Sequence, residues 1–476
     1  MHGVLAAYVG LVGVMLFFHE PWRDEAQAWL LARDASLWSL LTEYLRYEGS
    51  PGLWHLILIL PAKAGMPYVT LNVITAAAGI FAAYLILYHS PFPPVLKAIL
   101  PFTYYLFYQY VVVARSYALI APLLFLLALV WPKKTTRVYL FTFLLVLLAN
   151  TSPHGALIAG SLMALHVLDV VRSRAQLGRQ ILRRQFVAVG AFGVVTALLV
   201  LQLLPPSDRT DSFPAPGLSS LRTVATIANG ATTGFEPVSI LVFLALIWWF
   251  WRSRTLSLFI VPASAVAALS VFAYHRAYHV GISALLALFV LWVSLARIPR
   301  GTAVDFRARR LALAALVVVC AVQTFWSAGS FRYDLRHPYS GSEALAAFLG
   351  AHGDGKTIYA ASFPSEDSDV HGSVGAAPAS AVQPYFDRNI YANYNHGRPQ
   401  SFWKWSTGID LIYEPRRILN AQPDLIVLSV VWRGSERQPR LYPGYRVLAR
   451  FPGKLAWKNG TLERESYILL ERTTPS

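Results

Sequence analysis

Long apolar runs fill the first two-thirds of the chain. Between Met1 and about Gly329, ten or more of them approach the roughly 20 residues that a helix needs to cross a bilayer. The runs are continuous and do not alternate with polar residues, which excludes an outer-membrane barrel. The pattern predicts a polytopic α-helical membrane protein of about 11–13 helices. Eleven full crossings are expected, at 3–18, 67–88, 97–113, 117–131, 138–150, 155–171, 186–204, 237–251, 256–273, 280–295 and 311–328.

One further apolar run, 53–65, is too short to span and suits a re-entrant or tilted half-helix. The segment 19–52 before it predicts two short helices, one over 24–33 and a second capped by Ser36. The second helix is expected to lie flat on the membrane, because its apolar residues share one face. These residues are Leu37, Leu40, Leu41, Tyr44 and Leu45.

The pattern changes near residue 330, where apolar runs shorten and Gly, Pro, Asn and Asp become frequent. We therefore divide the chain into a membrane module, 1–329, and a soluble α/β domain, 330–476. A helix is expected from Glu343 to about Ala351. Strands are expected at Thr357–Ala361, Leu425–Val431, Tyr445–Phe451 and Tyr467–Leu470.

The charge distribution gives the predicted orientation. The chain has a net charge of +16, and a strongly basic chain is often a nucleic-acid-binding protein. Here, however, the basic residues gather in short loops between apolar runs, so no nucleic-acid partner is expected. By the positive-inside rule, loops 133–137, 172–184, 252–254 and 297–310 face the cytoplasm. Segment 19–52 has three basic and six acidic residues and belongs outside, as does the C-terminal domain.

Two adjacent carboxylates, Asp24 and Glu25, follow directly on the first apolar run and are the candidate catalytic residues. An enzyme at a membrane surface that activates a hydroxyl needs a positioned carboxylate base, and Asp24 is the first choice. The alternative is that both residues only decorate the first turn of a helix, where the helix dipole favours negative charge.

Arg115 is the candidate ligand for a phosphate group. It stands among apolar residues and tyrosines, where an ionisable side chain is costly and usually serves a site. A guanidinium binds phosphate through two hydrogen bonds. Arg276 and His279, from a compact basic loop expected on the same side, are supplementary phosphate ligands. The alternatives are snorkelling of Arg115 to lipid headgroups and simple solvation of the loop.

Glu48, His55 and Tyr117 are the candidate substrate-binding residues. Glu48 and His55 flank a Gly-Ser-Pro-Gly turn near the outer boundary, although the same turn also suits an ordinary polar lead-in to a helix. The aromatic stretch Tyr385–Trp405 could stack on a sugar, but core packing is the favoured interpretation.

No cofactor or metal is expected, because the chain has no P-loop, no dinucleotide-binding glycine motif and no zinc pattern. The acidic loop around Asp367 and Asp369 could bind a divalent cation, but such loops are more often solvated and metal-free. Cys320 is the only cysteine, so no intramolecular disulfide can form.

Taken together, these motifs resemble the C-type glycosyltransferase (GT-C) superfamily, most nearly its branch of bacterial protein O-mannosyltransferases and lipid A aminoarabinose transferases. The resemblance rests on Asp24-Glu25, on Glu48-Gly-Ser-Pro-Gly-Leu-Trp and on Arg115-Ser-Tyr117-Ala-Leu. It covers most of the chain as architecture but only about 20 residues as motif. Relatives often have His-Pro-Pro where this chain has Ser50-Pro51-Gly52.

The resemblance implies metal-independent transfer of a sugar, with inversion, from a polyprenyl-phosphate donor to an acceptor hydroxyl on a glycan, lipid or protein. Asp24 would be the base, Arg115 the phosphate partner and Glu25 structural or secondary. The expected location is a bacterial inner membrane, in contact with its lipids, with the active site and the C-terminal domain on the periplasmic side. The alternatives are a lipid-linked glycan polymerase or ligase, and a non-enzymatic flippase or transporter of lipid-linked sugars.

Overall fold

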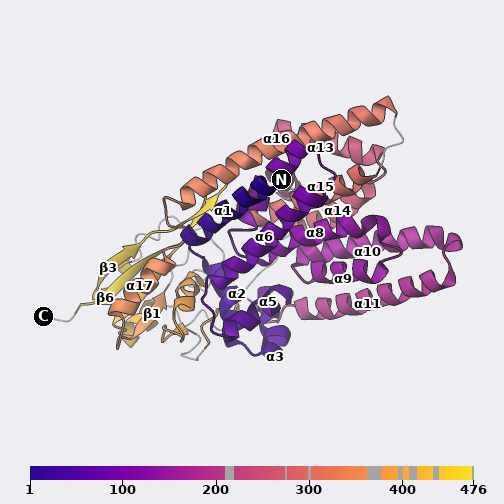
Figure 1. Ribbon diagram of the computed structural model, residues 1–476. Coiled ribbons are helices and arrows are strands. Elements are labelled where there is room, and N and C mark those ends of the chain that lie inside the picture. The colour runs from indigo at the N-terminus through magenta and orange to yellow at the C-terminus, as the bar shows by residue number, and fades with distance from the viewer. Residues whose placement is uncertain are drawn as a thin grey trace.

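The computed structural model is mostly helical, at 70% of the residues that it describes. It describes residues 1–209, 219–273, 276–297, 302–361, 377–394, 400–406, 415–431 and 439–473. The helices form one elongated body, and a small sheet lies at one end of it (Figure 1).

Six helical segments in the described residues are long and apolar enough to cross a membrane, or up to eight if each of two bent helix pairs is one span. The six contain α6 (Thr70–His89), α8 (Ile120–Val130), α10 (Pro153–Ser173), α11 (Arg179–Leu203), α15 (Val280–Ala296) and α16 (Ala303–Asp334). The bent pairs are α1 (His2–Phe18) with α2 (Arg23–Asp34), at 83°, and α12 (Ser219–Ala231) with α13 (Glu236–Arg252), at 79°.

Three shorter apolar helices complete this part of the chain: α5 (Leu53–Lys63), α9 (Val138–Ala149) and α14 (Leu256–Phe272). The short helix expected at 53–65 is therefore confirmed as α5. Large apolar side chains on α11 remain exposed, with Phe186 at 81% and Leu198 at 61%. Such a surface suits contact with lipid and is consistent with an integral membrane protein.

The crossing expected at 97–113 is wrong. This segment is broken into α7 (Pro94–Ile99), a 3-10 turn η2 (Leu100–Phe102) and a π-helical turn η3 (Tyr105–Gln109). Pro101 lacks an N–H to continue a helix, and the Thr103 hydroxyl bonds back to the Leu100 carbonyl at 2.7 Å. Residues 104–114 are buried in the protein, which is where irregular backbone is tolerated at membrane depth. The structure thus offers fewer spans than the eleven expected.

The predicted cytoplasmic loops come together in pairs. Lys134 forms an ion pair with Asp169, which joins the first basic loop to the end of α10, just before the second loop. Arg252 contacts Asp305 at 2.7 Å, which joins the third to the fourth. The turn from α10 to α11 lies at the end of the helices opposite the sheet (Figure 1).

All four predicted strands are confirmed. They are β1 (Ile358–Ala361), β2 (Leu425–Val430), β3 (Tyr445–Phe451) and β6 (Ser466–Arg472), in the order β1-β2-β6-β3, and only β1 and β2 are parallel. Both faces of β2 are buried, which explains its unbroken apolar run. The predicted helix at 343–351 is α17 (Ser342–His352), and η8 (Ala377–Tyr385) and α18 (Pro415–Ala421) lie between strands in the sequence.

A hairpin that the sequence did not predict, β4 (Lys454–Trp457) and β5 (Gly460–Arg464), connects this sheet region to the helices. At its tip, the Lys458 N–H donates to the Tyr104 hydroxyl at 3.1 Å, and the Ser330 hydroxyl donates to the Lys458 carbonyl at 2.7 Å. The Lys458 ammonium lies 4.1 Å from the centre of the Trp326 ring. The hairpin is therefore docked on α16 and on the broken segment.

Segment 19–52 forms the predicted helix α2 and the predicted Ser36 cap, whose hydroxyl accepts from the Ser39 N–H at 3.0 Å. The second helix is irregular, as α3 (Leu37–Ser39), a π-helical turn η1 (Leu40–Tyr44) and α4 (Leu45–Glu48). Leu40 and Leu45 are fully buried and belong to one cluster with Phe402. Part of the face expected to meet lipid is therefore covered by α2 and by Phe402, while Leu37 stays exposed. The contact with Phe402 is too distant in sequence for local periodicity to show.

Candidate functional site

The site begins at the first turn of α2. Pro21 precedes the helix, and the Glu25 carboxylate accepts the Trp22 backbone N–H at 3.1 Å, as in a capping box. Asp24 lies in the same turn, where the helix dipole favours a negative charge. Local sequence therefore fixes the helix start and places two successive carboxylates on different sides of it.

Asp24 and Arg115 form an ion pair. The Arg115 Nη1 lies 3.0 Å from the Asp24 Oδ2, and the Arg23 Nε lies 3.9 Å from Oδ1. The Asp24 side chain is 27% exposed and the Arg115 side chain 17%. The two leading candidates for chemistry thus meet in space, and both retain access to solvent.

Aromatic rings surround the Arg115 guanidinium. Its Cζ lies 4.3 Å from the ring centre of Tyr278, 5.1 Å from that of Tyr117 and 5.9 Å from that of Trp22. The Tyr278 carbonyl accepts the Tyr110 hydroxyl at 2.7 Å, which holds this tyrosine in place. Stacking on rings keeps a planar guanidinium in a fixed plane, ready for two parallel hydrogen bonds to an oxyanion.

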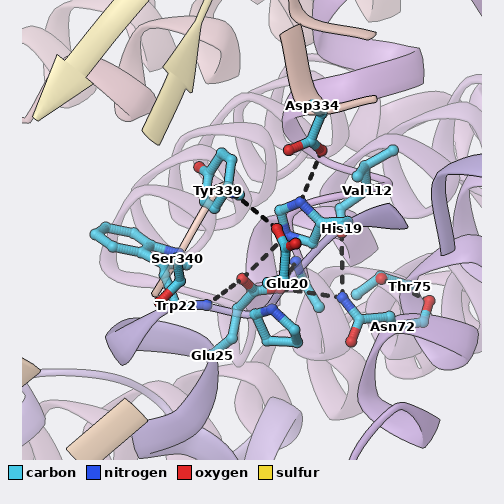
Figure 2. A network of polar contacts seen from close by, with 12 residues as sticks. His19, Glu20, Trp22, Glu25, Asn72, Thr75, Val112, Asp334, Tyr339 and Ser340 are labelled. Atoms are coloured by element: carbon cyan, nitrogen blue, oxygen red, sulfur yellow. Dashed lines mark hydrogen bonds and ion pairs between the residues drawn. The ribbon is translucent and has the colours of Figure 1, made fainter. Parts of the chain in front are cut away.

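Glu25, by contrast, is completely buried. Its Oε1 accepts the Ala114 backbone N–H at 2.6 Å and the Asn72 amide at 3.2 Å. Its Oε2 accepts the Trp22 N–H and contacts the His19 ring at 3.3 Å (Figure 2). Because Glu25 follows Asp24 and bonds the residue before Arg115, it joins the backbones that carry the ion pair.

His19 lies between two carboxylates. Its Nε2 contacts Glu25, and its Nδ1 contacts Asp334 Oδ2 at 3.0 Å (Figure 2). Carboxylates only accept hydrogen bonds, so both ring nitrogens must donate and the imidazole carries a positive charge. Tyr108 also donates to Asp334, at 3.1 Å. This network fastens the end of α16 and the broken segment to the start of α2.

The C-terminal region reaches the site through Arg23. The Arg23 guanidinium contacts Glu463 at 2.6 Å and Glu465 at 3.3 Å, and the Arg23 backbone N–H donates to Glu465 at 3.0 Å. Glu465 also accepts the Ser340 hydroxyl at 2.9 Å. Burial raises the pKa of Glu465 to about 8, although Arg23 acts in the opposite direction. The residue beside Asp24 is thus held by the end of β5 and the turn into β6.

The other predicted residues fall into two groups. Tyr117, His279 and Arg276 form the first group, beside Arg115. The Tyr117 hydroxyl lies 2.9 Å from the His279 Nε2. Arg276 is exposed, and its backbone N–H donates to the His279 Nδ1. Glu48 and His55 form the second group and contact other residues. Glu48 accepts the Gln27 amide at 2.7 Å, and His55 is buried in α5 and hydrogen-bonded to the Pro51 backbone.

Sequence reasoning missed His19, Asn72, Asp334, Glu463 and Glu465. Asn72 carried a usable signal, since a polar side chain in an apolar helix usually has a partner. The favoured interpretation of the aromatic stretch fits the structure, because Tyr391, Tyr394 and Trp403 are core residues. The proposed cation loop at Asp367 and Asp369 lies outside the described residues, among which no group of three or more His, Cys, Asp or Glu side chains is placed to hold a metal.

No protein-family model matches this chain, and no curated protein matches it in sequence.

Proposed function

We propose that the protein is a membrane glycosyltransferase that transfers a sugar from a polyprenyl-phosphate donor to an acceptor hydroxyl. The observation that carries the proposal is the Asp24–Arg115 ion pair, at 3.0 Å. It brings a carboxylate that can act as a base next to a guanidinium that can bind phosphate, and the chain has helices long and apolar enough to cross a membrane.

In the proposed reaction, the acceptor oxygen attacks the anomeric carbon of the sugar. A bond forms between these two atoms while the bond from the anomeric carbon to the phosphate oxygen breaks. The acceptor proton moves to the Asp24 carboxylate, and the leaving electron pair stays on the phosphate, where Arg115 neutralises its charge. Attack opposite the leaving group inverts the anomeric configuration.

The ion pair also links donor binding to activation of the base. A phosphate that binds Arg115 competes with Asp24 for the guanidinium. Loss of that partner frees the Asp24 carboxylate from the ion pair, so its oxygens can accept the acceptor's proton. The base would thus become available when a donor is in place. Glu25 has donors on both oxygens, so we assign it a positioning role and the proton transfer to Asp24.

The proposed donor suits a site beside apolar helices, since its isoprenoid tail stays in lipid while its sugar phosphate reaches Arg115. We place the protein in a bacterial inner membrane, with the site and the C-terminal region on the periplasmic side. The grouping of the basic loops away from the sheet supports this orientation.

The test offers a panel of polyprenyl-phosphate sugars and acceptors to the purified protein in lipid nanodiscs, with a chelator present. Wild type is compared with Asp24→Asn and with the control Asp169→Asn, an exposed carboxylate near the end of α10 that pairs with Lys134. We expect one donor to be consumed by wild type and by the control, and not by Asp24→Asn. Equal activity of all three proteins would refute Asp24 as the base. Transport of a donor across the bilayer without its consumption would favour a flippase.

A further inference from the structure

The His279 ring determines which way a hydrogen-bond chain runs beside Arg115. The Arg276 backbone N–H donates to His279 Nδ1 at 3.2 Å, so this nitrogen is an acceptor and carries no proton. A neutral imidazole then has its proton on Nε2. A doubly protonated ring is excluded, because it would point an N–H at the Arg276 N–H.

The next link follows from this tautomer. His279 Nε2 lies 2.9 Å from the Tyr117 hydroxyl and must donate to it. The Tyr117 oxygen therefore accepts, and its own proton points elsewhere. Within the described part of the chain, this hydroxyl contacts His279, and the Arg115 guanidinium lies over the same ring, 5.1 Å from its centre.

We propose that the Tyr117 hydroxyl donates to the phosphate held by Arg115, and that His279 is the positioning residue that turns this hydroxyl toward it. The proposal rests on the proposed function and assigns its phosphate contacts. His279 is only 3% exposed and contacts the Tyr117 hydroxyl, so we expect it to act through the tyrosine. Arg276 contributes its backbone N–H to this series of hydrogen bonds.

The fixed direction of the chain has a chemical consequence. A tyrosine that is free to rotate can offer a phosphate either its proton or its lone pairs, and the lone pairs repel an anion. A hydroxyl that already accepts from His279 presents its proton. Packing holds the His279 ring in place. The centre of the His154 ring lies 4.4 Å from the centre of the His279 ring, and the centre of the Tyr278 ring lies 4.8 Å from it.

The experiment measures binding of polyprenyl phosphate without sugar to the full chain in nanodiscs. We expect Tyr117→Phe and His279→Leu each to weaken binding about 10-fold, the cost of a hydrogen bond to a charged group. The double variant should lose little more, because both changes remove the same contact. His279→Gln should restore most of the binding, since its amide N–H can replace Nε2–H.

His166→Leu is the matched control, a buried histidine that bonds Gln185 at 2.8 Å and lies on α10 near the basic loops. It should bind polyprenyl phosphate as wild type does. The positioning role is overturned if wild type binds while His279→Leu binds equally well, or if the losses of the two single variants multiply in the double variant. Failure of wild type itself to bind polyprenyl phosphate would overturn the proposed function together with this role.

Discussion

Asp24 and Glu25 are neighbours in the sequence but belong to different environments. Asp24 is partly exposed and pairs with an arginine that is also partly exposed, whereas Glu25 is fully buried with donors on both oxygens. Successive helical residues point about 100° apart, since an α-helix has 3.6 residues per turn. One turn of α2 therefore supplies both an accessible carboxylate, Asp24, and a buried carboxylate, Glu25, that hydrogen-bonds the neighbouring backbone segments.

The C-terminal region repeats this contrast around Arg23. Glu465 is fully buried beside Arg23, while the Glu463 side chain remains 21% exposed. In both pairs the buried carboxylate receives backbone N–H donors and joins distant segments. The comparison indicates that the buried carboxylates hold the segments of this site together, whereas the partly exposed carboxylates are accessible to a substrate.

The largest expected effect on stability is that of Glu25→Gln. An amide cannot accept at both ends, so the donors on one oxygen lose their partner and the His19 charge is left with Asp334 alone. Disrupting a buried charged pair costs about 3–5 kcal/mol. Thermal unfolding followed by tryptophan fluorescence should show a clearly lower midpoint. An unchanged midpoint would mean that Glu25 does not hold these segments together.

A second prediction concerns pH and Glu465. Its raised pKa, about 8 against an ordinary 4.5, means that the folded protein binds this proton more tightly than the unfolded chain. Stability from this group is complete below pH 4.5 and is lost as the pH rises through 8. The unfolding midpoint of wild type should therefore fall relative to that of Glu465→Gln between pH 4.5 and 8. A constant or opposite difference would show that burial does not dominate at this carboxylate.

The third prediction tests the fixed plane of Arg115. Arg115→Lys keeps the charge but loses the planar fork that stacks on Tyr278 and Tyr117. With one charged hydrogen bond lost, donor affinity should fall about 10-fold. The unfolding midpoint should change little. If donor affinity is retained, a positive charge without the planar fork is sufficient at this position, and stacking on the tyrosine rings is not needed for donor binding.

The smallest effect is expected for Glu463→Gln. Its ion pair with Arg23 is partly exposed, and Arg23 keeps Glu465 as a partner. Such pairs contribute about 1 kcal/mol or less. A shift of the midpoint as large as that of Glu25→Gln would end the distinction between buried and exposed carboxylates.

Features governed by local pattern could be predicted from sequence. Strands β1, β2 and β6 contain short apolar runs, and α2 starts where Pro21 and Glu25 place it. The broken segment at 97–113 could not be predicted from hydropathy, because its apolar side chains are buried whether or not the backbone is helical. Burial in the protein, and not regular hydrogen bonding, permits that backbone.

The candidate site divides in the same way. Asp24, Arg115 and Tyr117 were identified individually, since each is a chemically capable residue in an informative position. Glu465 and Asp334 reach the site only through tertiary contacts, with Arg23 and with His19. The β4–β5 hairpin precedes Glu465. Its strand β5 has mostly polar residues and none that is fully buried, so the sequence has no apolar run there from which a strand could be predicted.

The most direct measurement compares Asp24→Asn with Glu25→Gln in the same nanodiscs, for sugar transfer from the donor that wild type consumes and for thermal unfolding. We predict that Asp24→Asn lowers turnover by about 10²–10⁴-fold, the usual contribution of a general base, with an unchanged unfolding midpoint. Glu25→Gln should lower the midpoint as well as the turnover. Wild-type turnover in Asp24→Asn, or a loss of stability equal to that of Glu25→Gln, would contradict the assignment of chemistry to the exposed carboxylate.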